Sequence, residues 1–122
     1  MQKKISPTQQ RGYEAEEAAC LFLVKQKLRL IEKNFQCKLG EIDLIMQDKD
    51  TLVFVEVRLR QHSQYATGLE SVDNYKQAKL RRTAEYYLQK KQLSGKLPCR
   101  FDVIAVTRQT NAFTFDWIQN AF

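Results

Sequence analysis

The stretch GEIDLIMQDKDTLVFVEVRLR, residues 40–60, decides the fold of this chain. It contains two runs rich in apolar and β-branched residues, 41–47 and 52–60, which predict two strands. The short polar segment between them predicts a tight turn, so we expect an antiparallel hairpin. Each strand also carries a carboxylate among apolar neighbours, Asp43 in the first and Glu56 in the second. A buried charge is costly unless it is paired, so this placement calls for a partner.

The register of the hairpin determines whether the two carboxylates meet. A two- or four-residue loop places Asp43 directly opposite Glu56 and Glu41 opposite Arg58, whereas a three-residue loop puts the two carboxylates on opposite faces. The first register also pairs two apolar triplets on the other face, which favours it. These triplets are Ile42, Leu44 and Met46 in the first strand and Val53, Val55 and Val57 in the second.

Two carboxylates in such a register need a cation. Directly opposite residues have Cβ atoms about 4.5–5.5 Å apart, and two negative charges that close repel each other. Magnesium suits this position because it takes one or two carboxylates and completes its shell with water and phosphate oxygens. The alternative is a solvated face on which Arg58 pairs with Glu41.

The size and ends of the chain predict one small domain. With 122 residues we expect a single domain over 1–122, with residues 1–8 as a flexible tail. No apolar run approaches the roughly 18 residues that span a bilayer, and the N-terminus lacks the apolar core of a signal peptide. We therefore expect a cytoplasmic protein.

The cysteine and histidine content excludes several kinds of site. Cys20, Cys37 and Cys99 are far apart in the sequence, and His62 is the only histidine. We expect the cysteines to be small buried hydrophobes rather than metal ligands or disulfides. A zinc site or a Cys–His nucleophile is hard to build from this set.

The rest of the chain predicts two helices and further strands. Residues 8–28 are apolar toward their C-terminal half, and three glutamates in the first turns would complement the helix dipole. A second helix is predicted over 71–92, with Ser71 as its N-cap. The order is αβββαβ, with a fifth strand as an option, and predicts an α/β domain with a mixed sheet. The remaining strands are predicted over 29–37, 99–107 and 112–117.

The net charge of +6 is concentrated in one part of the chain. A cationic face of this kind suits a polyanion such as nucleic acid, and the alternative is a solvated face on a basic protein. Between Asn74 and Arg100 the basic residues are Lys76, Lys79, Arg81, Arg82, Lys90, Lys91, Lys96 and Arg100, and the acid is Glu85.

These motifs together resemble the YraN family of small bacterial proteins. The resemblance covers nearly the whole chain and is strongest in GEIDLI at 40–45, VFVEVR at 53–58 and CRFDVIAV at 99–106. It implies a three-layer α/β/α restriction-endonuclease-like fold with a central mixed sheet. Through similarity to archaeal Holliday-junction resolvases, it also implies an endonuclease that uses Mg²⁺ or Mn²⁺ to cleave DNA phosphodiester bonds. Further matches are Gly12, Glu16, Asn34, Lys76, Leu80, Ala84 and the terminal FDWIQNAF.

The resemblance also implies a set of catalytic residues. Asp43 and Glu56 would bind the metal, and Glu16 would be the helix carboxylate that closes the site. Helical spacing alone leaves Glu17 open as an alternative, and the family pattern selects Glu16. Arg58 stands where the nuclease superfamily usually has lysine. Because arginine keeps its charge in proteins, Arg58 would hold a phosphate or stabilise negative charge rather than act as a base.

The implied partner is DNA, bound without sequence readout. Lys76 would contact a phosphate near the metal, and further basic residues would position the DNA backbone. The loop that contains Gln61, Tyr65 and Gly68 would border the site. Similarity to junction resolvases implies a homodimer that uses hydrophobic residues near the C-terminus. The predicted backbone contacts are Arg58, Arg60, Lys76, Lys79, Arg81 and Arg82.

Three functions are consistent with these features. The first is a magnesium-dependent endonuclease, structure-selective for branched DNA. The second is a nucleic-acid-binding module of the same fold that lacks efficient catalysis, and the third is a scaffold domain whose basic face is incidental. A metal titration separates the first from the others. Salt-dependent DNA binding separates the second from the third, because phosphate contacts release counterions.

Overall fold

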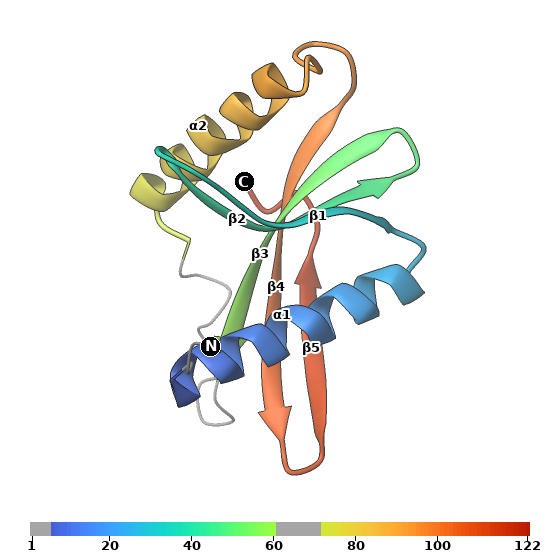
Figure 1. Ribbon diagram of the computed structural model, residues 1–122. Coiled ribbons are helices and arrows are strands. Elements are labelled where there is room, and N and C mark those ends of the chain that lie inside the picture. The colour runs from blue at the N-terminus through green and yellow to red at the C-terminus, as the bar shows by residue number, and fades with distance from the viewer. Residues whose placement is uncertain (1–5, 61–71) are drawn as a thin grey trace, which may run out of the picture.

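The computed structural model describes residues 6–60 and 72–122, which form two helices and one five-stranded sheet (Figure 1). The order αβββαββ confirms the predicted sequence of elements and includes the fifth strand. The elements are α1 (Pro7–Lys25), β1 (Arg29–Cys37), β2 (Gly40–Asp48), β3 (Thr51–Arg60), α2 (Asn74–Lys90), β4 (Cys99–Gln109) and β5 (Ala112–Ile118).

The sheet is mixed, and a helix covers each of its faces. The strand order is β1-β2-β3-β4-β5; β3 and β4 are parallel, and the other neighbours are antiparallel. In Figure 1, α1 crosses in front of β4 and β5, and α2 lies beside β2. Leu44 and Val55 pack in a cluster with Leu23 of α1, whereas Ile45 and Phe54 pack in a second cluster with residues of α2. The predicted three-layer α/β/α arrangement is confirmed.

The predicted hairpin register is confirmed over residues 44–48 and 51–55, where Leu44 pairs with Val55 and Ile45 with Phe54. The paired ladder ends there, so the predicted pairs of Asp43 with Glu56 and of Glu41 with Arg58 lie beyond it. The alternation of faces fails just before this point, because Ile42 packs in the α2-side cluster with Ile45. The predicted grouping of Ile42 with Leu44 and Met46 is therefore wrong. On the neighbouring strand, between the partners of Leu44 and Ile42, Asn34 has a φ of 54°. The register between β1 and β2 shifts between Leu30 and Glu32. A bulge of this kind bends a strand and increases its twist.

The helix starts differ from the prediction by one to three residues. Ser6 caps α1 through a capping box with Gln9, so Pro7 and Thr8 belong to the helix and not to the predicted tail. The first turn consequently contains no acidic residue, and the predicted interaction of the glutamates with the helix dipole is wrong. Asp73, rather than Ser71, caps α2, and its side chain accepts a hydrogen bond from the backbone N–H of Lys76 at 2.8 Å.

The aromatic residues near the C-terminus pack within the chain. Phe122 stacks on Phe101 with ring centroids 4.9 Å apart. Trp117 donates from Nε1 to Asp102 at 2.9 Å, and Asp102 is fully buried. Asp102 also accepts from Arg100 Nε at 3.0 Å. These contacts anchor the last strand, and the homodimer expected from this segment stays a prediction.

Two expectations from composition are tested by the described residues. The three cysteines are free, but only Cys20 is buried. The expectation of a buried hydrophobe is therefore wrong for the exposed Cys99. No helix among residues 6–60 and 72–122 has both the length and the apolar content needed to cross a membrane. His62 lies outside the described residues.

We predict that Gly40→Ala destabilises the protein by about 1–3 kcal/mol. A Cβ at position 40 would lie 2.7 Å from Thr83 Oγ1 and 3.2 Å from Lys79 Cε, so α2 would have to shift away from β2. Urea unfolding measures the change. Gly12→Ala is the matched control because a Cβ there meets no atom within 4 Å. Helix propensity predicts that the control stabilises α1 by up to about 1 kcal/mol. Equal stability of the two variants would contradict the close packing of α2 on β2.

Candidate metal centre and nucleic-acid interface

A pocket between the hairpin and both helices gathers four carboxylates. Its volume is about 360 Å³. One carboxylate comes from α1 and three come from β2 and β3, whereas α2 contributes two lysines. The packing of both helices on the sheet thus brings together side chains that are far apart in the sequence. The lining residues are Glu16, Glu41, Asp43, Glu56, Val57, Lys76, Lys79 and Leu80.

The pocket strongly disfavours the charged form of Asp43. Burial raises the pKa of its carboxyl group to about 8, and the negative charges of Glu56 and Glu16 act in the same direction. The backbone N–H of Val57 donates to Asp43 Oδ2 at 2.8 Å, which lowers the pKa but does not offset the burial. Asp43 therefore holds a proton at neutral pH when no cation is bound.

Glu56 differs from Asp43 because two basic side chains pair with it. Its carboxylate is buried and forms ion pairs with Lys76 of α2 and with Arg58, whose Nε lies 3.4 Å from Glu56 Oε2. The sequence predicted that Asp43 and Glu56 lie together, and the pocket contains both. One is protonated through burial and its acidic neighbours, and the other is held by two basic side chains.

Glu16, rather than Glu17, points into the pocket. Burial raises the pKa of Glu16, and the charges of Glu41 and Glu56 raise it further, whereas a hydrogen bond from the Asn34 side chain opposes the shift. Asn34 is the residue with positive φ in β1, and its side chain hydrogen-bonds to Glu16 of the pocket.

The other sequence candidates at this point have clear placements. Glu17 is exposed and pairs with Lys33, whose Nζ lies 2.6 Å from Glu17 Oε2. The alternative that spacing left open is therefore resolved in favour of Glu16 as the helix carboxylate of the pocket. Gln61, Tyr65 and Gly68, which we expected at the border of the site, lie outside the described residues.

Three of the carboxylates are close enough to share an ion. Ligand oxygens of Glu16, Glu41 and Asp43 lie within 4.8 Å of one another. Carboxylate oxygens are the ligands that Mg²⁺ and Mn²⁺ prefer, so this donor set fits a hard divalent cation. Glu41 was not among the predicted ligands, although its alternation with Asp43 on one strand face could have identified it. Glu56 belongs to the same pocket but not to this group of three.

The predicted nucleic-acid contacts fall into two groups. Lys76 and Lys79 line the pocket, and Arg58 reaches it through Glu56. Arg82 is exposed on α2. Of these four basic residues, Lys76, Lys79 and Arg58 lie at the pocket, whereas Arg82 is not among the residues that line it.

Arg60 and Arg81 do not join them. The Arg60 side chain is buried and forms an ion pair with Asp116 of β5, which argues against the predicted phosphate contact. The guanidinium of Arg81 lies 5.3 Å from the ring centroid of Phe122, on the other flank of α2. The predicted single basic face of this helix is therefore wrong, because sequence proximity does not imply a shared helix face.

Comparison with known proteins gives a family match over most of the chain. Residues 15–106 match the model of the uncharacterised protein family UPF0102, a span that contains the four pocket carboxylates. Three relatives carry the name UPF0102 protein. One from Pseudomonas syringae pv. syringae (strain B728a) is 52% identical over 118 residues, which cover 96% of each chain. One from Nitrosomonas eutropha is 46% identical over 97% of each chain. One from Nitrosococcus oceani is 42% identical over 92% of this chain and 90% of its own.

We predict that Asp43→Asn stabilises the metal-free protein increasingly as the pH rises from about 4 to about 8. Because the folded pKa is raised, the folded state keeps a proton that the unfolded state has lost, so wild-type stability falls through this window. The slope from this group is at most about 1.4 kcal/mol per pH unit. An asparagine side chain does not ionise, so the variant does not lose stability in this way as the pH rises. Its side-chain oxygen can still accept the hydrogen bond from the backbone N–H of Val57. Urea unfolding in EDTA at about pH 5, 7 and 9 measures it. Parallel curves for the two proteins would contradict the assignment.

Glu56→Gln should have the opposite effect. It removes the anion that Lys76 and Arg58 pair with, and we expect destabilisation of about 1–3 kcal/mol at neutral pH. The same urea series measures it. A Glu56→Gln variant as stable as wild type would show that these ion pairs contribute nothing to the fold.

Proposed function

This chain belongs to the uncharacterised protein family UPF0102, and we propose that it is a divalent-metal-dependent nuclease that cleaves DNA phosphodiester bonds. The observation that carries the proposal is the burial of Asp43 among three other carboxylates, with a raised pKa. Strongly perturbed groups in a pocket are typical of functional sites. A carboxylate cluster that costs stability without a cation is best explained by a role in binding one.

Glu16, Glu41 and Asp43 would hold Mg²⁺ or Mn²⁺ through their carboxylate oxygens. When bound, the ion supplies a Lewis acid for the phosphoryl oxygens and lowers the pKa of a coordinated water. Compared with the predicted ligands, this set keeps Glu16 and Asp43 and has Glu41 in place of Glu56. Glu56 lines the same pocket and would become a further ligand if its ion pairs with Lys76 and Arg58 opened.

The basic residues of the pocket would bind the phosphate. The side chain of Lys76 is 42% exposed. Its ammonium group would therefore pair with a phosphate oxygen in place of Glu56 while it still lines the pocket. Lys79 lies at the same rim. Arg58 stays protonated and stabilises negative charge, but it cannot accept a proton from water. The chain thus supplies binding and charge neutralisation rather than a lysine base.

A DNA-binding module without efficient catalysis is the second candidate. It is favoured by Arg58, which stands where related nucleases use lysine, and by the pairing of Glu56 with two cations rather than with the other ligands. A DNA partner also agrees with the net charge of +6 and with the expected cytoplasmic location. Metal-dependent cleavage distinguishes the two candidates.

The test compares two neighbouring glutamates of α1. Purified protein is incubated with labelled flap, junction and single-stranded DNA in Mg²⁺, Mn²⁺ or EDTA. We expect cleavage only with metal, and a loss of at least about 100-fold in Glu16→Gln, comparable to the loss of a metal-site contact. Glu17→Gln is the matched control because Glu17 pairs with Lys33 outside the pocket, and its activity should equal that of wild type.

Two outcomes would contradict the proposal. If no substrate is cut in either metal, the nuclease function is wrong and the binding module becomes the better account. If cleavage occurs but Glu16→Gln and Glu17→Gln cut equally well, the activity does not come from this pocket.

A further inference from the structure

One flank of α2 alternates exposed tyrosines with basic side chains. Residues spaced by three or four lie on the same flank of a helix. Tyr75 is 75% exposed and Tyr86 is 42% exposed, and the basic residues between and after them are exposed as well. We call this set the tyrosine stripe. Its members are Tyr75, Lys79, Arg82, Tyr86 and Lys90.

The tyrosine stripe is separate from the packed face of the helix and continuous with the carboxylate pocket. The packed face contains Leu80, Thr83 and Tyr87, which are buried. Lys79 belongs to the stripe and also lines the pocket. Glu85, the single acidic residue of α2, follows Arg82 by three residues and borders the stripe. The stripe is therefore a largely cationic and aromatic surface that adjoins a candidate active site at Lys79.

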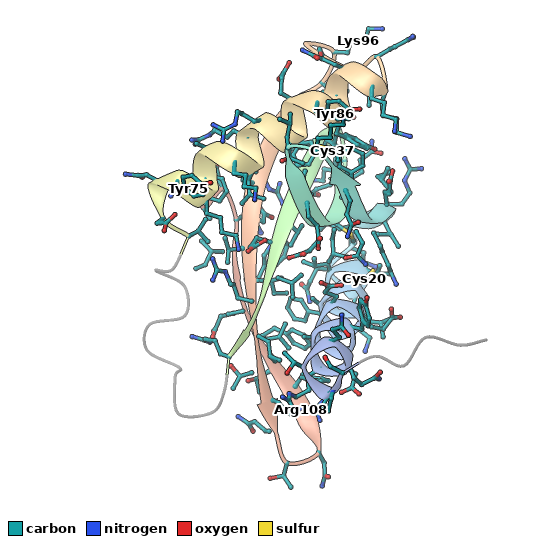
Figure 2. The ribbon with its side chains drawn as sticks, turned by 60° about the vertical axis from the view of Figure 1, so that its left-hand side comes forward. Cys20, Cys37, Tyr75, Tyr86, Lys96 and Arg108 are labelled. Carbon is teal, nitrogen blue, oxygen red and sulfur yellow. The ribbon has the colours of Figure 1, made fainter. Side chains whose placement is uncertain are left out.

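The Tyr86 ring lies against a buried aromatic residue. Its centroid lies 6.3 Å from that of Phe35, with the two ring planes at 35°, and Phe35 is buried. Lys90 places its Nζ 6.0 Å from the same Phe35 ring. Figure 2 shows Tyr75 toward the start of α2 and Tyr86 farther along it. The two tyrosines thus lie at separate points along one exposed helix.

The spacing of the tyrosines suits a short stretch of a strand. The rise of about 1.5 Å per residue puts them about 17 Å apart along the helix axis. Stacked nucleotides repeat about every 3.4 Å, so this length corresponds to at most about five nucleotides. The two basic residues between the tyrosines, Lys79 and Arg82, would fall beside the phosphates of that stretch.

We propose that the tyrosine stripe binds an unpaired DNA strand, with bases stacked on Tyr75 and Tyr86 and phosphates paired with Lys79 and Arg82. The inference rests on the proposed function, since it names the form of DNA that would reach the pocket. Aromatic side chains stack on any exposed base, and basic side chains follow the backbone. Bases in a duplex are stacked on each other, so a duplex would contact the basic residues through its phosphates and would not stack on the tyrosines.

The test measures binding in EDTA, where metal-dependent cleavage cannot occur. Fluorescence anisotropy follows a labelled oligothymidylate of about 12 nucleotides, within the usual site sizes, and a blunt duplex of similar length. Tyr75→Ala and Tyr86→Ala should each weaken binding of the single strand by about 5-fold or more, and should leave duplex binding and the salt slope unchanged. Tyr75→Phe and Tyr86→Phe should bind within about 2-fold of wild type, because phenylalanine also stacks.

Tyr13→Ala is the matched control. Tyr13 is 51% exposed on α1, outside the stripe, so this variant should bind both probes like wild type. Thermal unfolding identifies any variant that is destabilised, and if Tyr86→Ala is one, the result for Tyr75, which is 75% exposed, decides. The inference is overturned if Tyr75→Ala binds the single strand like wild type, or if it weakens both probes equally.

Failure of the nuclease proposal gives a different result. A protein that shows the expected tyrosine dependence in EDTA but never cleaves DNA supports strand binding and rejects catalysis. A protein that cleaves DNA through Glu16 but binds the single strand equally well without the tyrosines keeps the nuclease proposal and loses this inference.

Discussion

The contact between Asp43 and Glu56 is the constraint on which the rest of the structure depends. Asp43 and Glu56 lie just beyond the last paired residues of the hairpin, Leu44 and Val55, and the packing of α1 and α2 on opposite faces of the sheet closes a pocket around them. The two carboxyl groups differ in charge. Burial keeps a proton on Asp43, whereas Glu56 is an anion paired with Lys76 and Arg58. This arrangement avoids two adjacent buried anions, which would be far more costly. It also leaves an oxygen-rich site whose proton the proposed divalent cation would displace.

Each layer of the domain contributes one part of that site. The α1 face that packs on Leu44 and Val55 also carries Glu16 into the pocket. Gly40 lets α2 approach β2 closely, and this approach brings its lysines to the pocket rim. The described residues of the site therefore lie on strands and helices with buried supports, which favours a fixed geometry. A weakened contact between α2 and β2 should disturb the binding residues before it disturbs the core.

The sequence predicted the elements and the hairpin register because both follow from apolar periodicity and turn length. It also identified Asp43 and Glu56 as a pair, and family resemblance selected Glu16 over Glu17. It failed where a local feature overrides periodicity. Ile42, which pairs with β1 next to the positive-φ residue Asn34, packs in the other cluster. The prediction of one basic face ignored that Arg81 lies on the other flank of α2. The burial of Arg60 with Asp116 depends on a contact between distant strands, which no local pattern encodes.

Proton release on metal binding tests the central claim most directly. Mn²⁺ is titrated into the wild-type protein by calorimetry at pH 7, in buffers of different ionisation enthalpy. Because Asp43 is protonated in the metal-free pocket, binding should release about one proton, and the release should disappear above about pH 8. Asp43→Asn should show neither the binding heat nor the release. Absence of Mn²⁺ binding to the wild type, or binding without proton release at pH 7, would contradict the assignment of this pocket as a metal site.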